Sequence, residues 1–163
     1  MKNRLNKNRL KLKFSHISLL SCSLFFSITA HAQQCLAPQQ LVETLFKQYI
    51  LKPNPTSFQN EKKPILKKYL TESLASKIDR DNKCQAKTES VCHIDFDLLT
   101  NAQDTPENPK YLLKTLNPLQ VQATITGLNY KEKIIFEFFK ENNCSKINNI
   151  TYQNGRNLNK ILK

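Results

Sequence analysis

The chain has 163 residues and a formal net charge of +12, with 25 basic residues against 13 acidic ones. Six of the bases and none of the acids lie in residues 1–32, so residues 33–163 carry a much smaller positive excess. A remainder of this length is typical of one domain, which buries roughly 65–70% of the surface that its unfolded chain exposes. The two glycines exclude a glycine-rich nucleotide-binding loop, a collagen repeat and a flexible linker.

Residues 1–32 have the parts of a secretory signal peptide. A basic start precedes mostly apolar residues over 17–29, a stretch too short to span a bilayer comfortably. Residues 30–32 (Ala-His-Ala) form an Ala-x-Ala site, so we expect cleavage before Gln33. A retained membrane anchor and lipid attachment at Cys22 are the alternatives. The pattern predicts export to the periplasm, with no membrane span after cleavage and no nucleic-acid partner.

Four cysteines remain after the predicted cleavage, an even number that suits disulfides in an oxidising compartment. Four cysteines allow three pairings. The short polar segment between Cys84 and Cys92 favours a bond between these two, which leaves Cys35 to pair with Cys144. The chain has no Cys-x-x-Cys, and its cysteine spacings match no zinc pattern.

Helical periodicity marks the first half of the mature chain. Apolar residues recur at 3.6-residue spacing over 38–51, behind a proline that suits the first helical turn. A second periodic stretch covers 64–70, and Thr71 is placed to cap a third helix. The polar segment 79–89 is expected to be a loop.

The period changes to two in the second half. The expected elements are a short strand or extended segment over 93–98, a loop over 101–109, strands over 119–126, 134–139 and 144–152, a turn at Asn142-Asn143 before the last strand, and a short helix over 158–162. This order predicts an α+β domain with N-terminal helices packed on a curved antiparallel sheet and a short C-terminal helix. A cone-shaped fold resembling nuclear transport factor 2 or cystatin is the natural candidate.

The segment over 95–104, Asp-Phe-Asp-Leu-Leu-Thr-Asn-Ala-Gln-Asp, resembles the D-x-D…N-A-Q-D stretch of the Domain of Unknown Function 3828 family of small exported bacterial proteins. The resemblance extends to Tyr-Ile at 49–50, Leu-Thr-x-x-Leu over 70–74 and a strand-turn-helix over 147–158, and it spans roughly residues 38–162. It implies a fold like that of nuclear transport factor 2 and no particular reaction. Cys144 stands where the family often has tryptophan, and the Ala-x-Ala site replaces the lipid-attachment cysteine of many members.

Three alternating polar residues, His93, Asp95 and Asp97, form the sharpest chemical cluster. On a strand they would share one face and could hold a divalent cation, because carboxylates favour Ca²⁺, Mg²⁺ or Mn²⁺ and histidine tolerates Zn²⁺. The alternative is a solvated face opposite apolar Ile94 and Phe96. This weak cation possibility is the only cofactor that the sequence suggests.

The loop that follows supplies short polar side chains, which either fix a turn or contact a ligand or partner. The candidate contact residues are Asp95, Asp97, Asn101, Gln103, Asp104 and Tyr152. A buried aspartate assisted by Tyr130 or Tyr152 could act as a general base. We assign no catalytic residue, because His93 is the only histidine of the mature chain and no Ser-His-Asp set has supporting spacing.

Lysines are densest at 62, 63, 67 and 68, on a helix whose other face is apolar. They fit either a solvated helix face or a surface for acidic envelope polymers or an acidic protein. Taken together, the sequence favours a non-enzymatic periplasmic binding module, a monomer or weak dimer, whose partner is a protein or envelope component. The alternatives are an immunity protein that neutralises a cell-wall-targeting toxin, and a metal-dependent or acid/base enzyme that uses residues 93–104.

Overall fold

The computed structural model describes residues 35–163, so the predicted signal peptide and its cleavage site lie outside the described residues. The elements in chain order are α1 (Pro38–Tyr49), η1 (Phe58–Asn60), α2 (Lys63–Tyr69), α3 (Glu72–Thr88), β1 (Lys110–Asn117), β2 (Gln120–Gly127), β3 (Tyr130–Glu141), β4 (Cys144–Tyr152) and α4 (Leu158–Ile161). The predicted α+β class with an antiparallel sheet is confirmed. Within the described range, no helix is long and apolar enough to cross a membrane.

The four strands form one antiparallel meander in the order β1-β2-β3-β4. Two-residue turns join consecutive strands, and the turn between β3 and β4 consists of Asn142 and Asn143. Both asparagines have positive φ, 51° and 63°, a conformation that asparagine adopts more readily than most other residues with a side chain. The sequence therefore encodes this hairpin locally, and the predicted turn is confirmed.

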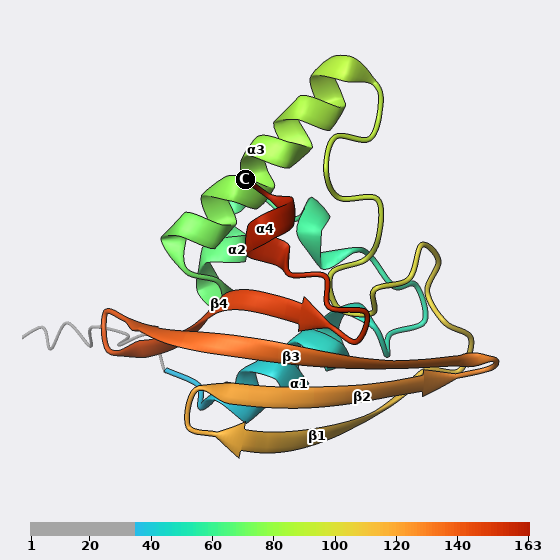
Figure 1. The fold of residues 1–163 in the computed structure, drawn as a ribbon, viewed down its shortest axis with the longest axis vertical. Helices are drawn as coiled ribbons and strands as arrows, with labels where there is room; N and C mark the ends of the chain where they lie inside the picture. The colour runs from blue at the N-terminus through green and yellow to red at the C-terminus, as the bar shows by residue number, and fades with distance from the viewer. Residues whose placement is uncertain (1–34) are drawn as a thin grey trace, which may run out of the picture. The chain divides into compact units, whose positions relative to one another are not determined.

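The hydrophobic core lies on one face of the sheet. Val121 of β2 pairs with Phe136 of β3, and both side chains are fully buried. On the same face, Phe46 of α1 packs edge-on against Phe136 and Tyr111, with ring centroids 6.0 Å and 5.0 Å apart. Figure 1 shows α1 behind β2 and β3, with α3 and α4 beyond β4. Burial on this face alone follows from the alternation of side chains along each strand.

A β-bulge in β4 keeps two isoleucines in the core. Ile147 and Ile150 are three residues apart, so strict alternation would turn them to opposite faces of the sheet. The register shifts so that Phe138 pairs with Ile147 while Glu137 pairs with Asn149, which leaves one extra residue in β4. Both isoleucines are consequently fully buried.

The segment 79–89, expected to be a loop, is helical up to Thr88. Thr71 caps α3 as predicted, accepting a hydrogen bond from the Leu74 amide at 3.3 Å. The second half of α3 extends away from the sheet (Figure 1), so it carries few apolar residues. An Asp79–Lys83 ion pair at 2.7 Å links successive turns there instead.

Two further segments were less predictable. Of the two forms expected for residues 93–98, a short strand or an extended segment, the strand is not formed; the predicted alternation holds, since Ile94, Phe96 and Leu98 are buried. Strand β1 was not anticipated from the sequence. Its apolar residues occupy both faces, and Leu112 is 71% exposed, so the segment shows no clean alternation.

Two disulfides connect the four cysteines in the favoured pairing, Cys35–Cys144 and Cys84–Cys92. The first joins positions 109 residues apart and fastens the start of the described chain to β4. The second joins positions 8 residues apart and closes the segment that follows α3. By loop-closure entropy, the long loop stabilises the fold by about 5 kcal/mol and the short one by about 2.5 kcal/mol.

Removing the long-range disulfide should therefore cost more stability than removing the local one. We expect the double variant Cys35→Ser/Cys144→Ser to lose roughly 6–10 °C more in melting temperature than Cys84→Ser/Cys92→Ser, because the two losses differ by about 2 kcal/mol. Thermal unfolding followed by circular dichroism measures the difference. An equal or larger loss for the Cys84/Cys92 pair would contradict the assignment of Cys35–Cys144 as the principal covalent support.

Candidate functional site

Asp97 organises the loop that the sequence analysis singled out. Its Oδ1 accepts hydrogen bonds from the backbone amides of Leu99 at 2.9 Å and Thr100 at 3.0 Å, and from the Thr100 hydroxyl at 3.2 Å. The Asp97 amide donates to the Ala102 carbonyl at 2.8 Å, which closes the loop from the other side. Burial raises the pKa of the Asp97 carboxyl above its ordinary value, and these hydrogen bonds only partly offset that effect.

Two tyrosines fasten the same loop to the sheet. Tyr130 donates its hydroxyl hydrogen to the Thr100 carbonyl, and Tyr152 donates to the Leu98 carbonyl at 3.3 Å. Burial raises the phenol pKa of both tyrosines. These hydroxyls therefore donate to backbone carbonyls and stabilise the loop. The same two tyrosines were considered in the sequence analysis for polarising a substrate oxygen.

The remaining candidate contact residues have separate surroundings. Asn101 adopts φ 62° and donates from Nδ2 to Glu132 at 3.2 Å, while its buried Oδ1 has no partner among the described residues. Asp95 forms an ion pair with Arg156 at 3.6 Å. Gln103 and Asp104 are exposed at the surface of the loop. The six predicted contact residues thus belong to one region, and none of them lines any of five pockets in the described part of the chain.

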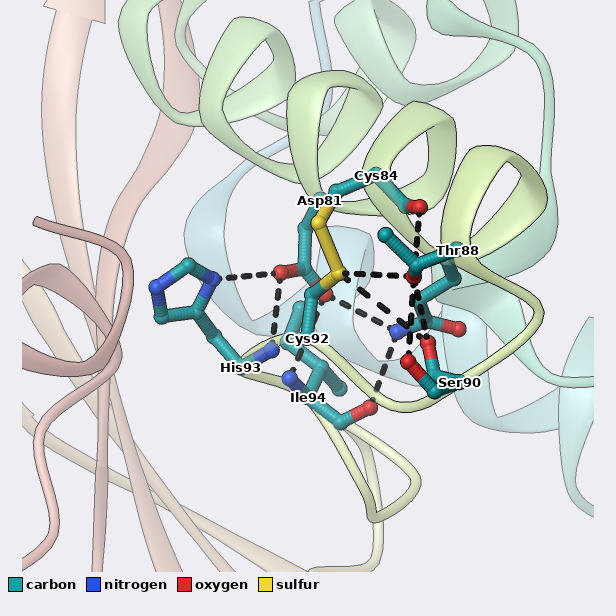
Figure 2. Close-up of polar contacts among 8 residues, drawn as sticks. Asp81, Cys84, Thr88, Ser90, Cys92, His93 and Ile94 are labelled. Carbon is teal, nitrogen blue, oxygen red and sulfur yellow. Dashed lines mark hydrogen bonds and ion pairs between the residues drawn. A yellow bond between two sulfur atoms is a disulfide. The ribbon is translucent and has the colours of Figure 1, made fainter.

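His93 belongs to a different cluster, built on Asp81 of α3 (Figure 2). The Asp81 carboxylate is 1% exposed and accepts the His93 ring nitrogen Nδ1 at 2.8 Å. It also accepts the backbone amides of His93 at 3.0 Å and Ile94 at 3.2 Å. Gln85 donates to the same carboxylate at 3.0 Å and to the Ile94 carbonyl at 3.0 Å. Asp81 and Gln85 thereby hold the segment after Cys92 against α3.

The three residues considered for a cation do not assemble into one site. His93 pairs with Asp81, Asp95 pairs with Arg156, and Asp97 accepts three hydrogen bonds within its own loop. Across residues 35–163, no group of three or more histidine, cysteine, aspartate or glutamate side chains is arranged to hold a metal ion. The irregular backbone over 93–98 accounts for this divergence, because the expected common face required a strand.

Sequence reasoning missed Asp81 entirely. It lies in the polar stretch expected to be a loop, and its partner His93 is twelve residues away. On a helix, positions 78, 81 and 85 share a face, so the helix itself would have aligned Asp81 with buried Ile78. This helical spacing could have identified Asp81 from the sequence, but the polar composition of 79–89 obscured it.

The lysines differ in whether an acidic side chain already neutralises their charge. In the dense cluster of α2, Lys63 and Lys67 both pair with Glu72, at 2.9 Å and 2.5 Å. These contacts lower the pKa of Glu72 to about 2. Lys146 of β4 is 9% exposed and donates to the Lys67 and Lys68 carbonyls at the end of α2. Much of this cluster therefore supports the fold.

A second group of lysines lies on the sheet face that no helix covers. It consists of Lys110 and Lys114 on β1 and Lys131 and Lys133 on β3. All four are exposed, and none takes part in an ion pair within the region the structure describes. Their charges are available to a partner.

Comparisons of this chain with protein-family models, with curated proteins and with solved structures yielded no match.

Replacing Asp97 tests what its carboxylate does. Asp97→Ala leaves two buried amides without an acceptor and should cost about 1–3 kcal/mol, whereas Asp97→Asn keeps the Oδ1 acceptor. Because burial raises the folded-state pKa, the carboxyl favours the folded state below about pH 4, and this contribution is lost as the pH rises.

We expect Asp97→Asn to match the wild type near pH 3 and to be at least as stable at pH 7. Urea unfolding at both pH values measures the free energy of unfolding of each protein. If Asn proves as damaging as Ala at pH 7, the negative charge itself is needed and this account of Asp97 is wrong.

Proposed function

We propose that this chain is an exported binding protein of the bacterial periplasm, whose uncovered sheet face docks an acidic protein. The carrying observation is the set of four exposed lysines on β1 and β3 that have no acidic partner among the described residues. The two disulfides and the signal-like N-terminus support export. The resemblance to the Domain of Unknown Function 3828 family of small exported proteins supports export and implies no particular reaction.

The strand register concentrates these charges. Lys110 and Lys131 both pair with Thr126, so they lie two strand spacings apart, about 10 Å. Lys133 follows Lys131 by two residues, about 7 Å along β3, and Lys114 lies about 13 Å along β1 from Lys110. The positions between them on this face are neutral: Leu112, Gln122, Thr124, Thr126 and Ile135. An acidic surface would meet four cations over one small area.

Exposed apolar residues on this face favour a protein as the partner. Leu112 lies between Lys110 and Lys114 on β1 and is 71% exposed. Phe139, 59% exposed, lies further along β3, beyond Ile135 and Glu137. Protein interfaces combine apolar contacts with a charged rim, and charge complementarity accelerates and orients the encounter. The lysines lie on an open sheet surface and not in an enclosed cavity, which suits a broad protein contact better than a small molecule.

The surroundings of residues 95–104 also support a binding role over a catalytic one. The Asp97 oxygen and the Tyr130 and Tyr152 hydroxyls are engaged in holding the loop in place. The loop keeps its shape through these bonds. Gln103 and Asp104 are exposed on this loop, which precedes the start of β1 at Lys110, so a protein docked on the sheet can also contact them.

Removing the four sheet-face charges should weaken binding to an acidic polypeptide. We expect the variant with Lys110, Lys114, Lys131 and Lys133 all changed to Gln to bind immobilised poly-L-glutamate at least about tenfold more weakly than the wild type at low salt. The matched control changes Lys62, Lys68, Lys87 and Lys160 to Gln, which removes the same charge from exposed positions elsewhere. Equal losses in the two variants would show that only net charge matters and would reject the docking face.

A photo-crosslinking residue at position 112 identifies the natural partner in the periplasm. We expect it to crosslink an acidic protein, and the crosslink to disappear when the four lysines are changed to Gln. The same residue at exposed Ala86 on α3 serves as the control. Identical products from both positions would contradict recognition by the sheet.

A further inference from the structure

A small pocket lies beside the end of the described chain, away from the open sheet face. Its walls come from α3, from the segment after Cys92 and from the residues that follow α4; Figure 1 shows the chain end next to α3. The pocket has a volume of about 170 Å³ and is lined by Lys77, Arg80, Asp81, Cys84, His93, Leu162 and Lys163. None of the four lysines proposed to dock a protein contributes to it.

Cationic side chains dominate the charged part of this wall. Lys77 and Arg80 are three residues apart on α3 and therefore share a helix face. Neither forms an ion pair within residues 35–163, and neither does Lys163. Lys77 donates to the side-chain oxygen of Asn159 at 3.0 Å, which fixes its ammonium group and leaves further N–H donors. Three cations thus surround a space with one acidic neighbour.

That acidic neighbour, Asp81, is already fully used. Its carboxylate is 1% exposed and accepts four N–H groups, from His93, Ile94 and Gln85. It therefore orients the His93 ring rather than opposing an anion in the pocket. With Nδ1 held by Asp81, the other ring nitrogen points away from that carboxylate (Figure 2). The imidazole is half-exposed and is presented in a fixed orientation.

The rest of the wall is apolar. Leu162 is buried at the end of the chain, and Cys84 contributes one side of the Cys84–Cys92 disulfide. A fully hydrated inorganic anion gains little from such a surface, whereas an organic anion can bury its hydrocarbon part there. The space suits a single ring or a short branched chain.

We propose that this pocket binds a small amphipathic carboxylate. The carboxylate lies against Arg80, which can donate two parallel N–H bonds to it, with Lys77 and the His93 ring beside it. The hydrocarbon part packs on Leu162 and the Cys84 sulfur. We infer this ligand class because cationic side chains and an apolar wall line the same pocket. It is independent of the protein-docking face, so either proposal can fail alone.

Benzoate and its neutral analogue benzamide test the charge requirement directly. The protein is the mature oxidised chain, and the signals are the His93 ring hydrogens and the Leu162 methyl groups in two-dimensional NMR. We expect benzoate to shift both sets with a dissociation constant of about 1 mM, and benzamide to bind at least about tenfold more weakly. Equal binding of the two compounds, or no shift with benzoate at about ten times that concentration, overturns the proposal.

Arg80→Gln provides the matched variant, because Arg80 is exposed on α3 and makes no ion pair with any other described residue. We expect it to weaken benzoate about tenfold and to leave benzamide unchanged. Lys87→Gln, about two turns further along α3, exposed, without an ion pair among the described residues and outside the pocket wall, should leave both affinities unchanged. If Lys87→Gln weakens benzoate as much as Arg80→Gln does, the anion is attracted to the whole helix and the pocket is not its site.

Discussion

Burial on only one face of the sheet is the constraint on which the rest of this domain depends. The inward side chains of β2, β3 and β4 are fully buried beneath the helices, and the bulge in β4 preserves that arrangement where Ile147 and Ile150 would otherwise diverge. Over β1, β2 and β3 the opposite face is uncovered, so its residues must remain compatible with water. Threonine, glutamine and lysine fill most of it, and four exposed lysines there have no ion-pair partner among the described residues.

Local patterns predicted the parts of the fold that local chemistry determines. The alternation over 119–126, the Asn142-Asn143 turn and the Thr71 cap each act through neighbours in sequence, and each corresponds to an element of the structure. The sequence was misleading where the burial of a residue depends on the position of its helix or strand in the fold. The second half of α3 is polar because it extends past the sheet, and β1 shows no alternation because it carries apolar residues such as Leu112 on its exposed face as well.

The candidate sites were predictable to a smaller extent, because a site depends on which residues meet. Alternation over 93–98 correctly separated the buried Ile94 and Phe96 from the outward His93 and Asp95. It could not supply their partners, Asp81 and Arg156, which come from α3 and from the turn before α4. Charge density was an equally incomplete guide. The crowded lysines near α2 are partly compensated by Glu72, whereas the uncompensated ones are scattered over β1 and β3 and gather only through strand pairing.

The two cationic surfaces differ in shape, and shape determines what each can select. On the open sheet face the four lysines are exposed to solvent, so binding there depends on several charges acting together and weakens steeply with salt. Beside α3 the imidazole is held by a buried carboxylate and the apolar wall is fixed by a disulfide, so less ordering remains to be done when a ligand arrives. Such a preorganised concave site can distinguish small molecules by the position of one carboxylate, while the sheet can recognise only the broad charge pattern of a partner.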